Sequence, residues 1–222
     1  MDDRFQDRFA AGRKLAQALQ AYAHHHDVLV LAVPRGGVPV GYEVAKALGA
    51  ELDVLIARKL GLPRHPELAM GAIASGGALY LNPDVIAISG VSRQEIEAVL
   101  ADERIELQRR ETQYRGARPP VRIDGRVVIV VDDGIATGAS MRAAVMALRS
   151  QHPDRIVVAV PVAPPDAKQR LGDIADDFVC VLSPDPFYAV GQFYDTFDQT
   201  SDEEVRRLLA RSREETPWRI PR

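Results

Sequence analysis

Apolar residues gather along the chain in short continuous runs, and the segments between the runs alternate apolar and polar residues with helical spacing. The runs are rich in β-branched residues, as in "DVLVLAV" and "RVVIVVDD". A strand that is apolar at every position is buried on both faces, which is typical of a parallel sheet covered by helices. Strands are therefore predicted at 27–33, 51–57, 126–133, 155–162 and 177–182.

The segments between the strands carry helix signals. Residues 92–115 start with Ser92 and Glu95 in capping-box spacing and stop at Gly116. Further helices are predicted at 5–22, at 40–49, after Gly138 and around 166–171. Strands that alternate with helices predict an α/β fold with a central parallel sheet flanked by helices.

Residues 58–81 do not fit this alternation. The segment 58–71 contains Gly and two Pro without a clear period, so we expect a long mobile loop there. Residues 71–81 predict a short hairpin that turns at Gly76 and Gly77. The arginines of the charged helix that follows are interpreted as a solvent-facing surface. They are Arg104, Arg109 and Arg110.

Composition fits a soluble globular protein. The chain has 222 residues, of which 46% are hydrophobic and 27% charged, so we expect a single domain spanning 1–222. Its net charge of -3 gives no footprint for nucleic acid or for an anionic membrane. No stretch approaches the ~18 apolar residues that span a bilayer, and the N-terminus does not have the pattern of a secretory signal. We therefore expect a cytoplasmic protein.

The stretch "VVIVVDDGIATGAS" at 127–140 carries the strongest chemical signal. A buried strand ends in Asp132 and Asp133, and the next turn opens a helix after Gly138. Ligands of parallel sheets bind at the carboxyl ends of the strands, and the unpaired N–H groups of a helix N-terminus bind phosphate. Because the two carboxylates would repel a phosphate, they suit sugar hydroxyls or a divalent metal. The pattern indicates a sugar 5-phosphate site, and a simple cap and turn without a ligand is the alternative.

This stretch resembles the phosphoribosyl pyrophosphate (PRPP) signature of the type I phosphoribosyltransferases, and the resemblance extends over most of the chain. It implies that the two acids hold the ribose hydroxyls and that the loop after them holds the 5-phosphate. The substrate-binding residues of this segment are then Asp132, Asp133, Gly134, Ile135, Ala136, Thr137, Gly138, Ala139 and Ser140.

Two further segments match loops of this family. The segment "AVPRGGVPVG" follows the first core strand, where the family has its pyrophosphate loop, often with a cis peptide bond; the matching residues are Arg35, Gly36 and Gly37. Consecutive glycines expose N–H groups to an anion, and a guanidinium grips phosphate oxygens. The segment 58–71 resembles the flexible catalytic loop, in which Arg58 and Lys59 would contact pyrophosphate.

The C-terminal part carries a shorter match. The segment "FYAVGQFYDTF" at 187–197 resembles the one with which purine-type members stack a base and approach the metal. It implies that Tyr188 or Phe187 stacks on the base and that Asp195 is a metal ligand near the pyrophosphate, while core packing of Phe187, Phe193 and Tyr194 is the alternative. We assign 58–81 to a flexible loop and hairpin, and 183–222 to a C-terminal hood or tail. Ala136 stands where oxopurine-type members carry an acid, which disfavours hypoxanthine or guanine.

The resemblance implies a small hood subdomain over the base site and a transfer of ribose 5-phosphate from PRPP to a nitrogen acceptor, such as a nucleobase, with release of pyrophosphate. Lys59, Arg35 and Asp133 would be catalytic, and Mg²⁺ would lie at Asp132, Asp133 and Asp195. The expected partners are small molecules and a second copy of the chain in a homodimer, without nucleic acid or membrane. A regulator that binds PRPP without turnover is the alternative function.

Overall fold

The computed structural model describes residues 4–215. Its central sheet has five strands in the order β2-β1-β6-β7-β8, and every neighbouring pair is parallel. The strands are β1 (Val28–Ala32), β2 (Glu51–Val54), β6 (Val127–Val131), β7 (Arg155–Val162) and β8 (Asp177–Leu182). All five lie inside the predicted ranges, so the predicted parallel α/β fold is confirmed.

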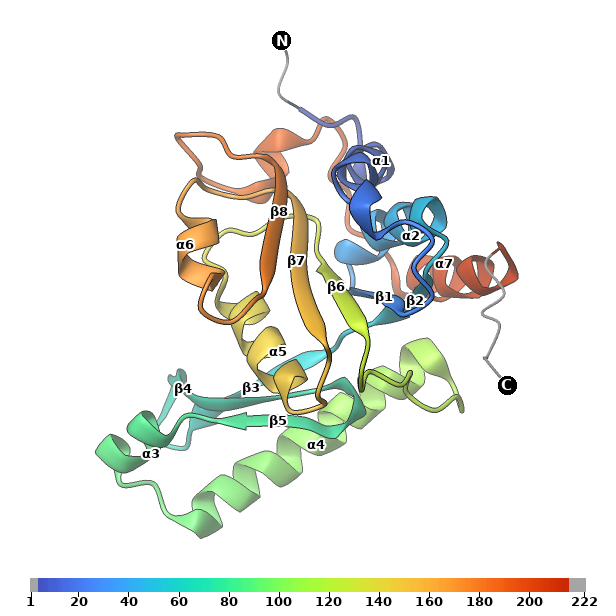
Figure 1. Ribbon diagram of the computed structural model, residues 1–222. Coiled ribbons are helices and arrows are strands. Elements are labelled where there is room, and N and C mark those ends of the chain that lie inside the picture. The colour runs from blue at the N-terminus through green and yellow to red at the C-terminus, as the bar shows by residue number, and fades with distance from the viewer. Residues whose placement is uncertain (1–3, 216–222) are drawn as a thin grey trace.

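Helices cover both faces of this sheet (Figure 1). On one face lie α1 (Arg8–Ala18), α2 (Gly37–Leu48) and α7 (Asp202–Glu215), and on the other lie α5 (Ala139–Arg149) and α6 (Ala167–Leu171). Successive residues of a strand point to opposite faces, so β6 sends Ile129 toward α2 and Val130 toward α5. The continuous apolar runs in the sequence therefore reflect two buried faces.

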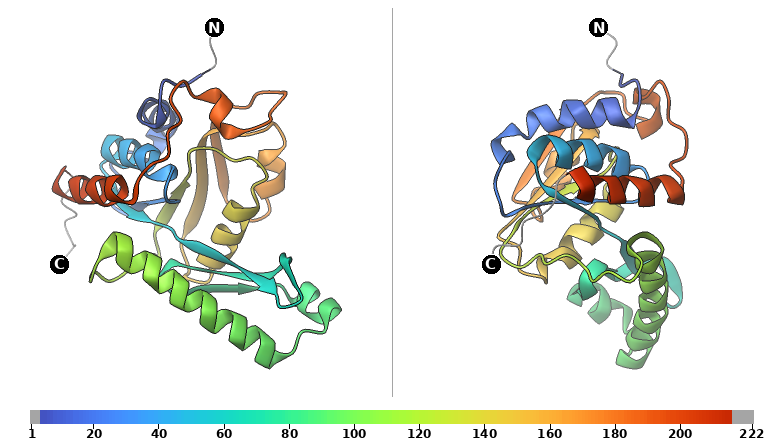
Figure 2. Two further views of the ribbon diagram at one scale, coloured as in Figure 1. Left: turned by 180° about the vertical axis from the view of Figure 1, so that it is seen from behind. Right: turned by 90° about the vertical axis from the view of Figure 1, so that its right-hand side faces the viewer.

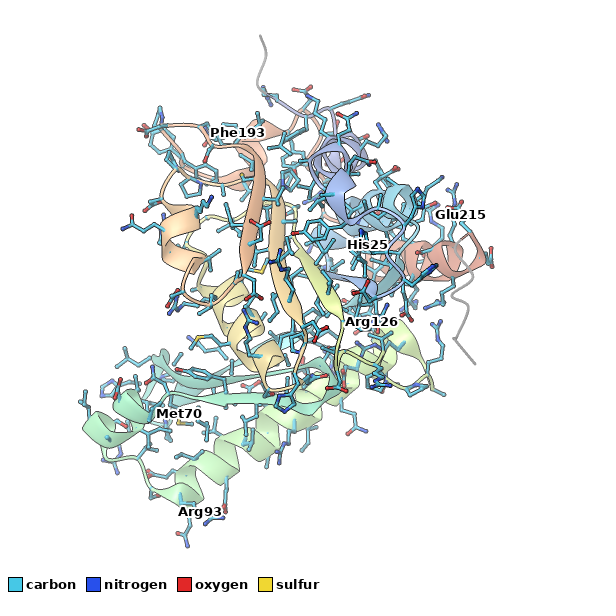
Figure 3. All side chains as sticks on the ribbon, in the orientation of Figure 1. His25, Met70, Arg93, Arg126, Phe193 and Glu215 are labelled. Carbon is cyan, nitrogen blue, oxygen red and sulfur yellow. The ribbon has the colours of Figure 1, made fainter. Side chains whose placement is uncertain are left out.

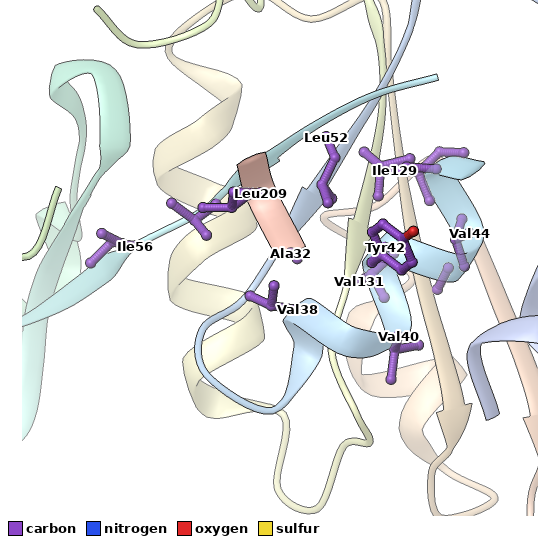
Figure 4. Close-up of a cluster of buried hydrophobic side chains, with 14 of the residues drawn as sticks. Ala32, Val38, Val40, Tyr42, Val44, Leu52, Ile56, Ile129, Val131 and Leu209 are labelled. Atoms are coloured by element: carbon purple, nitrogen blue, oxygen red, sulfur yellow. The ribbon is translucent and has the colours of Figure 1, made fainter. Parts of the chain in front are cut away.

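The helix α7 has no predicted counterpart in the sequence patterns. Its residues Val205, Leu208 and Leu209 are buried in the same core as α2, and Figure 4 shows Leu209 among the side chains of that cluster. Of the segment assigned to a hood or tail, residues 202–215 thus belong to the helical layer of the core. Residues 216–222 lie outside the described part of the chain.

A second, antiparallel sheet is formed by β3 (Ala57–Leu62), β4 (His65–Ala74) and β5 (Ala78–Leu81). The predicted hairpin is confirmed, with the 3-10 turn η2 (Ser75–Gly77) between β4 and β5. The prediction of a loop without regular structure at 58–71 is wrong, because β3 pairs with β4. Register shifts on both sides of Gly61 disrupt the apolar period, and a Cβ at Gly61 would lie 2.4 Å from the carbonyl oxygen of Pro66.

The second sheet lies between α5 and the long helix α4 (Arg93–Arg115), as both views of Figure 2 show. The predicted capping box of Ser92 and Glu95 is present at the start of α4. Met70, labelled in Figure 3, is fully buried in the core that also contains Leu100 and Leu107 of α4. A short helix, α3 (Pro83–Ser89), connects β5 to α4.

Arg115 joins the C-terminal end of α4 to the main sheet. The buried Arg115 pairs with Asp53 of β2 at 2.7 Å and donates to the carbonyl oxygen of Val54 at 2.8 Å.

The two remaining 3-10 turns are η1 (Gln20–Tyr22) and η3 (Val190–Phe193). Among the described helices, none is long and apolar enough to cross a membrane.

Candidate active site

The predicted phosphate loop starts where β6 ends and closes at the N-terminus of α5. Gly138, the residue before α5, has a positive φ of 78°, a conformation in which glycine avoids the steric penalty of a side chain. The side chains of Thr137 and Ser140 lie beside the helix N-terminus, and both residues are exposed. Arg170 of α6 donates to the carbonyl oxygen of Thr137 at 3.0 Å, which orients the loop. The N–H groups at the start of α5 are thus available to an anion.

The predicted pyrophosphate loop follows β1 and lies against the two acids. A cis peptide bond joins Pro34 to Arg35, as expected for such a loop. A Cβ at Gly36 would lie 2.0 Å from Oδ2 of Asp133, and a Cβ at Gly37 would lie 2.9 Å from Cα of Asp132. The close packing of the two loops therefore requires glycine at both positions, which explains the sequence "RGG".

The acidic pair is mostly buried and its carboxylates have partners. Oδ1 of Asp132 accepts from the backbone N–H of Asp133 at 2.8 Å. Oδ2 of Asp133 accepts from Nε of Arg8 at 2.8 Å, and the side chains of this ion pair are only 15% and 11% exposed. Burial raises the pKa of both acids, Asp133 raises the pKa of Asp132 further, and Arg8 opposes the increase in each.

A cavity of about 970 Å³ lies next to these two loops. It brings together four of the predicted residues, Arg35, Lys59, Ala139 and Ser140. Lys59 projects from β3, so a strand of the second sheet holds it in place of the predicted loop. Arg58 does not line this cavity, because its Nε pairs with Glu103 of α4 at 2.6 Å.

A sequence model of the family described as "Phosphoribosyl transferase domain" matches residues 3–197. The chain belongs to the phosphoribosyltransferase family. A protein of Mycobacterium tuberculosis named "Putative phosphoribosyl transferase" is 48% identical over 208 residues, which are 94% of this chain and 47% of that protein. The chain therefore spans about half the length of this curated relative.

A solved structure agrees over nearly the whole chain. TT1426 from Thermus thermophilus is 43% identical with a TM-score of 0.84, and the match covers 97% of this chain and 99% of that one. The AQ2163 protein from Aquifex aeolicus matches with 12% identity and a TM-score of 0.50, covering 93% of this chain and 89% of its own. The second likeness concerns the fold alone.

The C-terminal segment 187–197 has aromatic residues both in the core and on the surface. Phe187 stacks on Phe193 with ring centroids 5.3 Å apart, and the buried Tyr194 donates its hydroxyl to the carbonyl oxygen of Asp133 at 2.5 Å. These aromatic residues pack in the core, as the alternative interpretation allowed. Tyr188 differs, because its side chain is 81% exposed and accessible to a ligand.

Asp195, the predicted third metal ligand, pairs with Arg4 at 3.3 Å. Within residues 4–215 no group of three or more His, Cys, Asp or Glu side chains is placed to hold a metal ion. Asp195 is therefore not gathered with Asp132 and Asp133 into a three-carboxylate cluster, and this arrangement does not support its predicted role.

Sequence patterns missed several residues around the site. Arg8 of α1 pairs with Asp133, donates to the carbonyl oxygen of Asp198 at 2.6 Å and lies 3.9 Å from the ring centre of Phe197. Arg109 and Arg110 of α4 line the cavity. Arg104 is exposed and does not line it, as expected for a solvent-facing surface. These residues meet the site from distant parts of the chain, and no local motif marks them.

Proposed function

We propose that the chain transfers ribose 5-phosphate from PRPP to a nitrogen acceptor and releases pyrophosphate. The observation that carries this proposal is the contact between the two predicted loops, in which Gly36 and Gly37 pack directly on Asp133 and Asp132. This contact supports one continuous site for the sugar and its pyrophosphate. The family of the chain, a phosphoribosyltransferase family, supports the same reaction class.

In this reaction the bond between C1 of the ribose and the pyrophosphate oxygen breaks, and its electron pair leaves with pyrophosphate. The lone pair of the acceptor nitrogen forms the new bond to C1, and the nitrogen loses its proton. Arg35 and Lys59 would bind the departing pyrophosphate as its negative charge grows. Asp132 and Asp133 would accept hydrogen bonds from the ribose hydroxyls, and the segment from Gly134 to Ser140 would bind the 5-phosphate.

The donor set fits a magnesium ion that is held largely by the substrate. Mg²⁺ prefers oxygen ligands, keeps several waters and is commonly bound by one or two carboxylates together with substrate phosphates. Asp132 and Asp133 match that pattern, whereas a cage built only from protein side chains does not exist within residues 4–215. When bound there, Mg²⁺ would neutralise charge on the pyrophosphate leaving group.

The acceptor side is the least constrained part of the proposal. Tyr188 would stack on a planar base, because its ring is exposed at the end of the segment that packs on Asp133. Ala136 leaves no carboxylate at the loop position that oxopurine-type members use, so an adenine-like or non-purine acceptor is favoured over hypoxanthine and guanine.

A screen of nucleobases with PRPP and Mg²⁺, followed by pyrophosphate release, tests this function. We expect release with at least one acceptor. A variant that carries Asp132→Asn and Asp133→Asn should lose Mg²⁺-dependent PRPP binding far more than binding of inorganic phosphate. Absence of release with every base, or equal weakening of both ligands, would contradict the proposal.

A further inference from the structure

Cationic side chains line the cavity beside the pyrophosphate loop. Arg35 and Lys59 come from the loop and from β3, and Arg109 and Arg110 come from α4. Of the described residues that line this cavity, Asp202 alone carries a carboxylate. The chain as a whole carries a net charge of -3, whereas the side chains that line this cavity are positive in sum. This positive charge favours an anionic ligand.

The part of α4 that faces the cavity is held rigidly. Tyr114 donates its hydroxyl to Oδ1 of Asp202 at 2.6 Å, and Gln113 donates to Oδ2 of the same carboxylate at 2.7 Å. These bonds, together with the nearby guanidinium of Arg35, lower the pKa of Asp202 and keep it charged. Because Arg115 is also anchored in the core, Arg109 and Arg110 are carried on a fixed stretch of helix.

One carboxylate, that of Glu106, competes with an anion for these two arginines. Nε of Arg109 and Nε of Arg110 lie 2.7 and 2.8 Å from the carboxylate of Glu106, one turn earlier on α4. All three side chains are partly or mostly exposed, so solvent screens their charges and an ion pair of this kind is readily exchanged for another anion. A group with two phosphates offers more charge and several oxygens in the geometry that a guanidinium binds in a bidentate manner.

We propose that Arg109 and Arg110 bind the pyrophosphate group of the ligand from the α4 side of the cavity. The inference rests on the proposed function for the identity of the whole ligand, PRPP. It assigns a binding role to a helix that lies outside every motif on which the family resemblance depends. The pyrophosphate would then be held by cations from both sheets, with Arg35 and Lys59 joined by the two arginines of α4.

Titration calorimetry at one fixed ionic strength, with inorganic pyrophosphate and with ribose 5-phosphate as separate probes, tests the inference. The double variant Arg109→Ala with Arg110→Ala should weaken pyrophosphate binding about tenfold or more, since charge-assisted bonds are lost. Binding of ribose 5-phosphate should change by less than about twofold, because its phosphate belongs at the α5 loop. Arg104→Ala is the matched control on the same helix and should change neither affinity.

A second variant should change the pyrophosphate affinity in the opposite direction. Glu106→Gln removes the competing carboxylate but leaves both arginines, so pyrophosphate affinity should increase by roughly two- to fivefold. If the double variant does not fold, Arg109→Ala alone carries the test, because its side chain is 61% exposed.

The outcomes separate this inference from the proposed function. Unchanged pyrophosphate affinity in the arginine variants, or equal loss in Arg104→Ala, would overturn the role of α4 whether or not PRPP is a substrate. A pyrophosphate affinity that depends on Arg109 and Arg110 would support that role even in a protein that releases no pyrophosphate from PRPP.

Discussion

The packed loops after β1 and β6, which lie next to the cavity, and the α4 side of that cavity are built in opposite ways. On the side of the loops, Asp132 and Asp133 are mostly buried against the backbone of Gly36 and Gly37 and are not among the residues that line the cavity. On the α4 side, Lys59, Arg109 and Arg110 stand on the rigid elements β3 and α4 with more exposed side chains. One side is acidic and tightly packed, and the other is basic and open.

This difference suggests a division of labour. Under the proposed function, close packing would fix where the ribose and its 5-phosphate lie, since a shift of either loop would require the other to move. The exposed cations would instead follow the pyrophosphate as it leaves, because long side chains adjust without repacking the core. Substitutions on the two sides should therefore fail in different ways.

The largest effect is expected on the basic side, at Lys59. If the protein is an enzyme, Lys59→Ala should lower turnover by ~100- to 1000-fold, because negative charge on pyrophosphate develops in the transition state. PRPP affinity should fall by only about 1 kcal/mol, because the same charge is partly present in the bound substrate. Steady-state kinetics and calorimetry on the same preparations measure both values.

The same experiment decides between an enzyme and a regulator. A regulator has no transition state, so it should release no pyrophosphate with any acceptor and should lose most of its PRPP affinity when Lys59 is removed. That combination would contradict the enzyme interpretation. It would also contradict the proposal that the packed loops position the ribose while the exposed cations stabilise the charge on pyrophosphate.

A smaller effect is expected on the packed side, at Gly36. The residue has φ of -61° and ψ of -33°, which any side chain tolerates, so contact alone excludes a side chain. Gly36→Ala should force Asp133 from its place beside Arg8 and weaken PRPP binding by about 100-fold, or ~2.7 kcal/mol. Turnover of bound substrate should change less than affinity.

Gly116→Ala provides the control for general destabilisation. Gly116 follows α4 with a φ of 65° and has open space at its Cβ position, so alanine there should cost about 1 kcal/mol through backbone strain. Its PRPP affinity should remain that of the unsubstituted protein. Equal loss of affinity in both glycine variants would show that the packed side has no special role.

The same contrast explains what the sequence could predict. The acidic side is encoded in one contiguous stretch at 127–140, in which a buried strand, two acids and a helix start follow one another. The structure has the strand and the helix start within the predicted ranges. The parallel sheet was predictable for the same reason, because each strand is marked by its own apolar run. The glycines of the loop after β1 were found by their position at a strand end.

The basic side comes from tertiary contacts that no local pattern encodes. The strands β3 and β4 were taken for a loop because the register shifts around Gly61 break the period-two alternation. Arg109 and Arg110 have the spacing of a solvent-facing surface, and only the position of Asp202, about 90 residues later, shows which way that face of α4 points. Arg8 likewise meets Asp133 across 125 positions.

The smallest predicted effect concerns stability, where the two sides should differ in sign. Asp132 has a raised pKa because burial and Asp133 disfavour its charge, so its folded state binds protons more tightly than the unfolded chain. Its stabilising contribution is complete below the ordinary aspartate pKa of about 4 and is lost as the pH rises through the raised value. Asp132→Asn should therefore raise the free energy of unfolding at pH 7.5 by about 1 kcal/mol, which corresponds to a melting temperature a few degrees higher. The gain at pH 4 should be smaller.

Asp202 should behave in the opposite way, because the hydrogen bond from Tyr114 lowers its pKa in the folded state. Its charged form adds stability above about pH 4, and that stability is lost as the pH falls through the lowered pKa. Asp202→Asn should cost a few tenths of a kcal/mol at pH 7.5, since the carboxylate is 35% exposed and screened by solvent. Thermal unfolding of both variants at the two pH values measures the pair. A loss of stability in Asp132→Asn at pH 7.5 would mean that the hydrogen bond from the N–H of Asp133 outweighs the cost of burying the charge, and the acidic side would then be stabilised by its carboxylates instead of strained by them.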